Sequence, residues 1–197
     1  VVVAYKNGNL DIILEDKTIY NLSFIKNSSS IGNKTINHIE VVNEFAYLST
    51  GLGIIVLNTD KLEIADTYNY TSSGNIITNA VTFDNVNIYA ASDNGVYFAD
   101  KNSLNLSDFN TWNIIPELGN LKYNGIVFFG NQLFASYDDP AWQADTLFTK
   151  NAGVWEKFPA TYTPRNITGI SASNNRLIEI ADQTLMIYDN LLNFIEQ

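Results

Sequence analysis

The chain has 197 residues, a formal net charge of −10 and no cysteine. Binding to nucleic-acid phosphates requires clustered Lys or Arg, and the sequence has no such cluster, so nucleic acid is excluded as a partner. The missing cysteines exclude disulfides, thiolate metal sites and cysteine nucleophiles. Apolar runs are far shorter than the roughly 20 residues of a transmembrane helix, so we expect a protein that is not membrane-spanning.

A strand-rich unit recurs along the chain with a nearly constant period. Tyr47 aligns with Tyr89, Phe134 and Ile178 at successive offsets of 42, 45 and 44 residues, and Val3 aligns with Tyr47 at 44. Runs of Val, Ile, Tyr and Phe alternate with turns rich in Asn and Gly, which is the pattern of short antiparallel strands. We therefore predict an all-β fold, a β-propeller of four-stranded antiparallel blades with a repeat of about 44 residues.

The predicted blades follow one another without a linker, so residues 1–197 form a single propeller domain or a fragment of one. Residues 1–30 make a partial blade with strands at 1–5, 10–14 and 18–25. The later blades are expected at 31–75, 76–120, 121–160 and 161–197. Because the first residues read as a second strand, we expect an incomplete set of blades from a larger propeller. A self-contained five-blade ring is the alternative.

Strand bounds can be predicted within these blades. The second blade should have strands at 36–42, 45–50, 53–58 and 63–70. In the third blade, the last strand at 111–115 follows a longer segment. Trp112 and Trp155 fall in predicted last strands, where packing between blades is expected.

The sequence offers little for catalysis. His38 is the only histidine and falls in a predicted first strand, beside the channel of a propeller. A lone histidine cannot form a His-rich metal site, and the nucleophile motif G-x-S-x-G is absent. A structural or exposed His38 is favoured over a binding contact. We therefore predict that the protein is not an enzyme and has no catalytic residues, no metal site and no cofactor.

The fourth blade departs from the repeat after Tyr137. Where the other blades have a short turn, it carries an insertion at 138–145 that contains Trp142 and three carboxylates, Asp138, Asp139 and Asp145. Loops on a rigid scaffold are free to carry recognition, and aromatic rings can bury apolar area there. We predict a partner-binding site made of Tyr137, Asp138, Asp139, Trp142 and Asp145. The alternatives are a solvated acidic loop and a Ca²⁺ site with clustered oxygen ligands.

Three stretches of the chain carry a family resemblance. They are VAYKNGN at 3–9, GNKTIN with AYL and GLGIIVL within 32–57, and IYAASDNGVY with NLSDFNTW within 88–112. These stretches resemble the PorZ-like β-propellers of Bacteroidetes type IX secretion systems, within the two-component-regulator-type propeller superfamily. The resemblance covers about 1–115 and weakens after Pro116.

The resemblance implies a non-catalytic interaction scaffold or accessory module in type IX protein secretion. It implies a protein partner from the secretion and attachment machinery; a surface glycan is the alternative ligand. It also implies an extracytoplasmic location, at the cell surface or in the periplasm of a Gram-negative bacterium. The alternative is a carbohydrate-sensing propeller of a two-component receptor, but the W-x-G-T motif usual in those propellers is missing.

Overall fold

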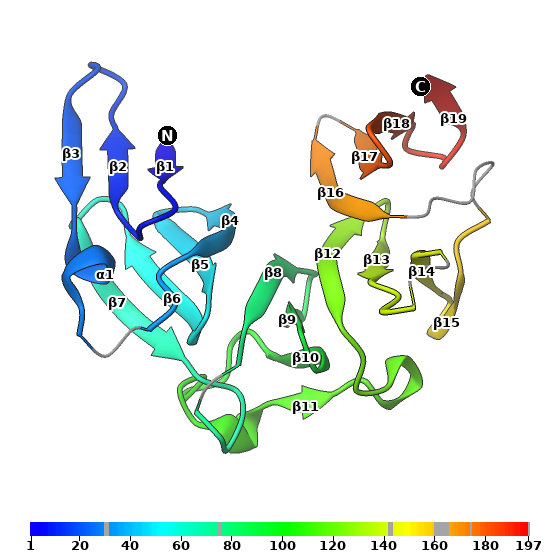
Figure 1. Cartoon of the computed structure of the whole chain (residues 1–197), viewed down its shortest axis with the longest axis horizontal. Coiled ribbons are helices and arrows are strands. Elements are labelled where there is room, and N and C mark those ends of the chain that lie inside the picture. Colours follow the sequence, from blue (N-terminus) through cyan, green and yellow to red (C-terminus); the bar gives the residue numbers. More distant parts are fainter. Residues whose placement is uncertain (30–31, 75, 142–143, 160–165, 174, 197) are drawn as a thin grey trace.

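The computed structural model describes the chain except residues 30–31, 75, 142–143, 160–165, 174 and 197. Its strands form five consecutive antiparallel sheets, which Figure 1 shows as an open arc with the two termini at its ends. The helical segments among these described residues are short and lie between strands: α1 (Phe24–Asn27), η1 (Phe109–Thr111) and η2 (Pro116–Leu118). The all-β propeller prediction is confirmed.

Each sheet is one blade, and its strands are ordered as in the sequence. Blade 1 contains β1 (Val2–Ala4), β2 (Leu10–Ile13) and β3 (Ile19–Leu22). Blade 2 contains β4 (Ile36–Val42), β5 (Phe45–Thr50), β6 (Gly53–Asn58) and β7 (Glu63–Tyr68). Blade 3 contains β8 (Thr78–Phe83), β9 (Asn87–Ser92), β10 (Gly95–Asp100) and β11 (Asn113–Ile114). Blade 4 contains β12 (Tyr123–Phe129), β13 (Gln132–Tyr137), β14 (Thr146–Asn151) and β15 (Val154–Lys157). Blade 5 contains β16 (Ile167–Ser173), β17 (Arg176–Ala181), β18 (Thr184–Tyr188) and β19 (Phe194–Glu196).

The turns form where residues that tolerate positive φ were expected. Asn43, Asn131 and Asn175 have φ values of 54°, 62° and 60° in the turns between first and second strands. Gly53 and Gly95, in the turns between second and third strands, have φ values of 93° and 109°. These conformations cost little for Gly and are tolerated by Asn, so the turn residues determine where each hairpin reverses.

Each junction between neighbouring blades contains its own apolar cluster, because both faces of a middle blade are covered. Alternate residues of a strand face opposite neighbours, so middle strands such as β6 and β9 carry apolar residues on both faces. Representative members are Leu10, Ile12, Leu48 and Ile55 between blades 1 and 2; Ile54, Val56, Val81 and Ala90 between blades 2 and 3; Ala91, Val96, Ile126 and Ala135 between blades 3 and 4; and Phe134, Leu147, Leu177 and Met186 between blades 4 and 5.

Side chains also link the first strands of neighbouring blades, which lie on the inner side of the arc in Figure 1. Each first strand of blades 2 and 3 has a β-bulge at its second residue, Asn37 or Asn79. The Asn37 amide donates to the Thr78 carbonyl at 2.8 Å, and the Asn79 amide donates to the Tyr123 carbonyl at 2.9 Å. The bulge thus frees one asparagine per blade to bond to the next blade.

His38 follows the first of these bulges, on β4, as predicted for an inner strand. Its Nδ1 accepts a hydrogen bond from the Val81 N–H at 3.4 Å, and burial lowers its pKa below the ordinary value. The neutral ring therefore bonds to the edge of the next blade, which supports the structural reading over a binding contact.

The alignment of Val3 with Tyr47 is wrong by one residue. Tyr47 faces blade 3, and the residue of blade 1 that faces blade 2 in the same way is Val2. The turn at 6–8 in blade 1 contains three residues, whereas the turn at 51–52 in blade 2 contains two. A single extra turn residue shifts the sequence offset, and a shift by one exchanges the two faces of a strand.

Trp112 is buried at 6 % exposure, and its indole N–H donates to the Leu106 carbonyl at 2.9 Å. It closes the η1 turn, so the last strand of blade 3 begins one residue later, at Asn113, and the predicted strand 111–115 is too long. Trp155 lies on β15 and packs against the cluster between blades 3 and 4. The prediction that both tryptophans pack in the core is confirmed.

Candidate functional site

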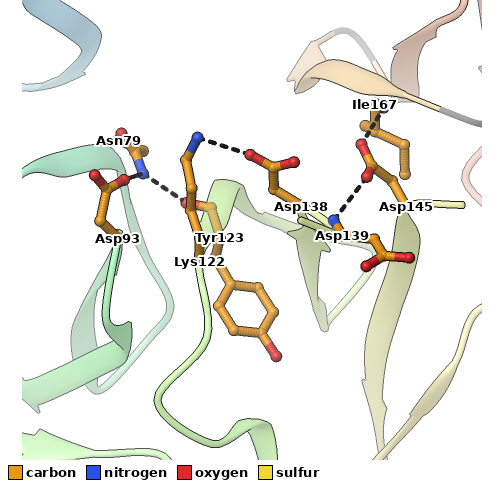
Figure 2. Close-up of polar contacts among 8 residues, drawn as sticks. All are labelled: Asn79, Asp93, Lys122, Tyr123, Asp138, Asp139, Asp145 and Ile167. Atoms are coloured by element: carbon orange, nitrogen blue, oxygen red, sulfur yellow. Dashed lines mark hydrogen bonds and ion pairs between the residues drawn. The ribbon is translucent and has the colours of Figure 1, made fainter. Parts of the chain in front are cut away.

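The insertion loop, residues 138–145, connects β13 to β14 and lies at the end of blade 4 where β13 finishes. Tyr137 is the last residue of β13, and Asp138, Asp139 and Asp145 lie within hydrogen-bonding reach of neighbouring segments (Figure 2). Trp142, which the sequence placed in the same site, lies outside the described residues. The structure therefore brings together four of the five predicted site residues.

Asp138 ties the insertion loop to the segment that precedes β12. Its carboxylate forms an ion pair with the Lys122 Nζ at 2.7 Å, and its N–H donates to the Lys122 carbonyl at 3.0 Å. The hydrogen bond to Asp138 raises the pKa of Lys122, so this amine stays protonated. Lys122 therefore acts as a fixed cation and is not available as a nucleophile.

Asp145 fastens the loop to blade 5. Its carboxylate accepts from the Ile167 N–H at 2.6 Å and from the Asp139 N–H at 2.9 Å, and the residue is 4 % exposed. The interpretation of the insertion as a solvated acidic loop is therefore wrong for Asp145. A buried carboxylate is stable here because two backbone donors replace its water.

Asp139 has a local role in the loop. Its carboxylate accepts from the Ala141 N–H at 2.9 Å and from the Ala144 N–H at 3.5 Å. These bonds hold the loop against itself, and Asp139 remains half-buried.

A cleft of about 470 Å³ opens between the insertion loop and the segment before β12. Its lining residues are Asn120, Leu121, Lys122, Tyr137, Asp138, Asp139 and Pro140. Leu121 is 45 % exposed beside Lys122, so the cleft offers an apolar contact next to charged groups. The Tyr137 ring packs against Tyr123 with centroids 5.9 Å apart, which fixes this wall of the cleft.

Carboxylates dominate the electrostatics of the cleft. Burial raises the pKa of Tyr137, and the charges of Asp139, Asp138 and Asp145 raise it further. Asp93 and Asp145 add to the effect of Asp138 in raising the pKa of Lys122. A ligand with a basic group would therefore meet a favourable potential here, and an acidic one would be repelled.

Asn79 of blade 3 holds the start of β12, next to Lys122, in place. Its side-chain amide donates to the Asp93 carboxylate at 2.9 Å and to the Tyr123 carbonyl at 2.9 Å (Figure 2). Sequence reasoning missed Asn120, Leu121 and Lys122, which lie in the connection between blades 3 and 4. The propeller topology could have pointed to them. The connection from the last strand of one blade to the first strand of the next lies at the same end of a propeller as the turns between second and third strands.

The described carboxylates of the insertion loop already bind backbone N–H groups or Lys122. Among the residues that the structure describes, no group of three or more His, Asp or Glu side chains is placed to hold a metal ion. The geometry of the described part of the loop therefore gives no support to the Ca²⁺ alternative. None of the described helices is long and apolar enough to cross a bilayer.

Comparison with solved structures shows the fold. The structure of PorZ, described as an essential bacterial surface component of the type IX secretion system of Porphyromonas gingivalis, matches 98 % of this chain with 17 % identity and a TM-score of 0.63. The extracellular domain of a protein described as a hybrid two-component system of B. thetaiotaomicron matches 98 % with 12 % identity and a TM-score of 0.61. The chain spans 30 % of the first structure and 29 % of the second.

Comparison at the sequence level is more specific. No curated protein matches the sequence of the chain. The profile of the family described as "TSS9, PorZ, N-terminal beta-propeller domain" matches residues 1–113, which is more than half of the chain. The chain therefore belongs to the PorZ N-terminal β-propeller family of the type IX secretion system.

Proposed function

We propose that this chain is a non-catalytic, extracytoplasmic interaction module that serves type IX protein secretion as a scaffold or accessory domain. The observation that carries the proposal is the family match over residues 1–113. The likeness to two-component receptor domains rests on 12 % identity and therefore concerns the fold alone. It does not favour carbohydrate sensing over secretion.

The cleft beside the insertion loop is the proposed contact with a protein partner. Loops that a rigid scaffold holds in place are common sites of recognition, and this loop is held at both ends by Asp138 and Asp145. The exposed Leu121 can bury apolar area, and the surrounding carboxylates favour a basic segment of the partner. His38 is engaged with the neighbouring blade, which supports a role without catalysis.

The test is photo-crosslinking in cells that carry a type IX secretion system. A benzoylphenylalanine in place of Leu121 should give an adduct with a protein of that system, identified by mass spectrometry. The matched control replaces Val86, which is 57 % exposed in the turn between β8 and β9 at the opposite end of blade 3. Equal adducts at both positions, or none at position 121, would contradict a specific contact. A glycan adduct at position 121 would favour the surface-glycan ligand over a protein.

A further inference from the structure

The junction of blades 4 and 5 contains a carboxylic acid in a position that is apolar elsewhere in the protein. Glu179 lies on β17, pairs with Ile170 and Met186 on the adjacent strands, and is 0 % exposed. The equivalent positions of blades 2, 3 and 4 are occupied by Leu48, Ala90 and Ala135, each also 0 % exposed. Blade 5 thus places an ionisable group where the repeat requires an apolar one.

Among the residues that the structure describes, the polar group nearest to Glu179 is the Tyr188 hydroxyl. Its face of blade 5 carries Leu177, Met186 and Tyr188, which pack against the apolar side of blade 4. Among the described residues, no donor or acceptor satisfies either carboxylate oxygen, and the buried Tyr188 hydroxyl also lacks a partner. The Tyr188 hydroxyl faces Glu179 as a potential donor and lowers its pKa, but the two groups lie outside strict hydrogen-bond geometry.

The described titratable groups on the faces that enclose Glu179 provide no cation. On blade 5 the group is Tyr188 of β18, and on blade 4 the groups are Asp145, ahead of β14, and Glu156 of β15. Asp145 is bound by two backbone N–H groups, and Glu156 is exposed at the outer edge. Burial therefore dominates and raises the pKa of Glu179 from 4.5 to about 7.

We propose that the junction of blades 4 and 5 is a pH-responsive joint, in which ionisation of Glu179 loosens blade 5 from blade 4. The neutral acid is compatible with the apolar interface, whereas a buried carboxylate without a cation or donor is strongly disfavoured. Opening the junction hydrates the charge. The stability that neutral Glu179 gives to the closed junction is fully present below the ordinary carboxyl pKa. It decreases as pH rises and is lost once pH passes about 7.

Hydrogen exchange of the intact chain between pH 5 and 8, corrected for the intrinsic pH dependence of exchange, measures this opening. The opening constant of β16–β19 should rise by up to about tenfold per pH unit between pH 5 and 7 and level off above that range. The central β8–β10 should change much less. Glu179→Gln should remove the rise in β16–β19, because the amide is neutral at every pH used.

A matched control comes from Glu40, a second carboxyl group whose pKa burial raises to about 7, on β4 of blade 2. Glu40→Gln should leave the pH profile of β16–β19 unchanged. Glu179→Leu, which restores the residue type of position 48, provides a second variant and should keep blade 5 closed at pH 8. The proposal is overturned if Glu179→Gln retains the wild-type rise. It is equally overturned if both Glu179 variants lose protection at every pH, since that result means the group is ionised and paired.

Discussion

Asp145 shows how one side chain can convert an insertion into part of the scaffold. At the junctions of blades 2 and 3 and of blades 3 and 4, a bulged asparagine bonds to the first residue of the next first strand. At the junction of blades 4 and 5, that residue is Ile167, and its N–H is bound by Asp145 from the insertion loop. The asparagines bind the carbonyl oxygen of that residue, whereas Asp145 binds its N–H, so the insertion adds a contact of its own at the same position of the repeat.

Asp145→Ala should lower the free energy of unfolding by about 2–3 kcal/mol, because the buried N–H of Ile167 and the partly buried N–H of Asp139 lose a charged acceptor. Urea denaturation of the two proteins measures the difference. Asp138→Ala is the matched control, since it removes a carboxylate of the same loop whose ion pair with Lys122 is partly exposed, with side chains 27 % and 46 % exposed. The control should cost at most about 1 kcal/mol. Equal losses in the two variants would argue against an anchoring role for Asp145.

At the scale of the element, the hairpin between second and third strands requires a residue without a side chain. Gly53 begins β6 at φ 93°, and a Cβ atom at this position would lie 2.3 Å from the Tyr68 carbonyl oxygen. That oxygen belongs to the end of β7 in the same blade, so the backbone of the outer strand would have to move. The close approach explains why the turn ends in a glycine at the first residue of β6.

Two glycine variants separate the cost of positive φ from the cost of this contact. Gly153 has a φ of 87°, close to that of Gly53, but a Cβ atom added there meets nothing within 4 Å. Gly153→Ala should cost roughly 1–2 kcal/mol from backbone conformation alone. Gly53→Ala should lower the free energy of unfolding by about 1–3 kcal/mol more than Gly153→Ala does, because the added Cβ atom clashes with the Tyr68 carbonyl. Thermal unfolding of both variants gives the comparison. Similar melting temperatures would show that β7 moves away from the added Cβ atom without loss of stability.

At the scale of the whole molecule, the blades follow one another along an arc, and each apolar cluster of described residues joins two blades that are neighbours in sequence. Stability in such an arrangement is approximately a sum of blade terms and nearest-neighbour interfaces. In this chain blade 3 has an apolar cluster on each side, whereas among the described residues blades 1 and 5 belong to one cluster each.

Native-state hydrogen exchange at pH 5, where Glu179 is mainly neutral, should therefore show a gradient of protection. Strands β8–β10 should exchange most slowly, and β1–β3 and β16–β19 most quickly. Uniform protection across the five sheets would mean that the arc unfolds as one cooperative unit. The comparison uses backbone amides of strands only, since turns exchange rapidly in any blade.

The fold was largely determined by local sequence features. A hairpin forms from neighbouring residues, so Asn and Gly at the turns and alternating apolar runs were enough to place the strands of blade 2 almost to the residue. Errors arose where a turn changed length. The alignment of Val3 with Tyr47 ignored one extra turn residue, and Trp112 was assigned to a strand although it closes a short 3₁₀ turn.

The candidate site was determined only in part by sequence. The insertion at 138–145 was visible as a break in the repeat, and its carboxylates marked it as a candidate. Their roles depended on residues distant in sequence: Asp138 meets Lys122, Asp145 meets Ile167, and Leu121 forms the apolar part of the cleft. The burial of Glu179 was equally invisible, because only the packing of blade 5 on blade 4 removes it from water. Local propensity specifies hairpins, whereas the environment of a charge depends on which blades the tertiary structure brings together.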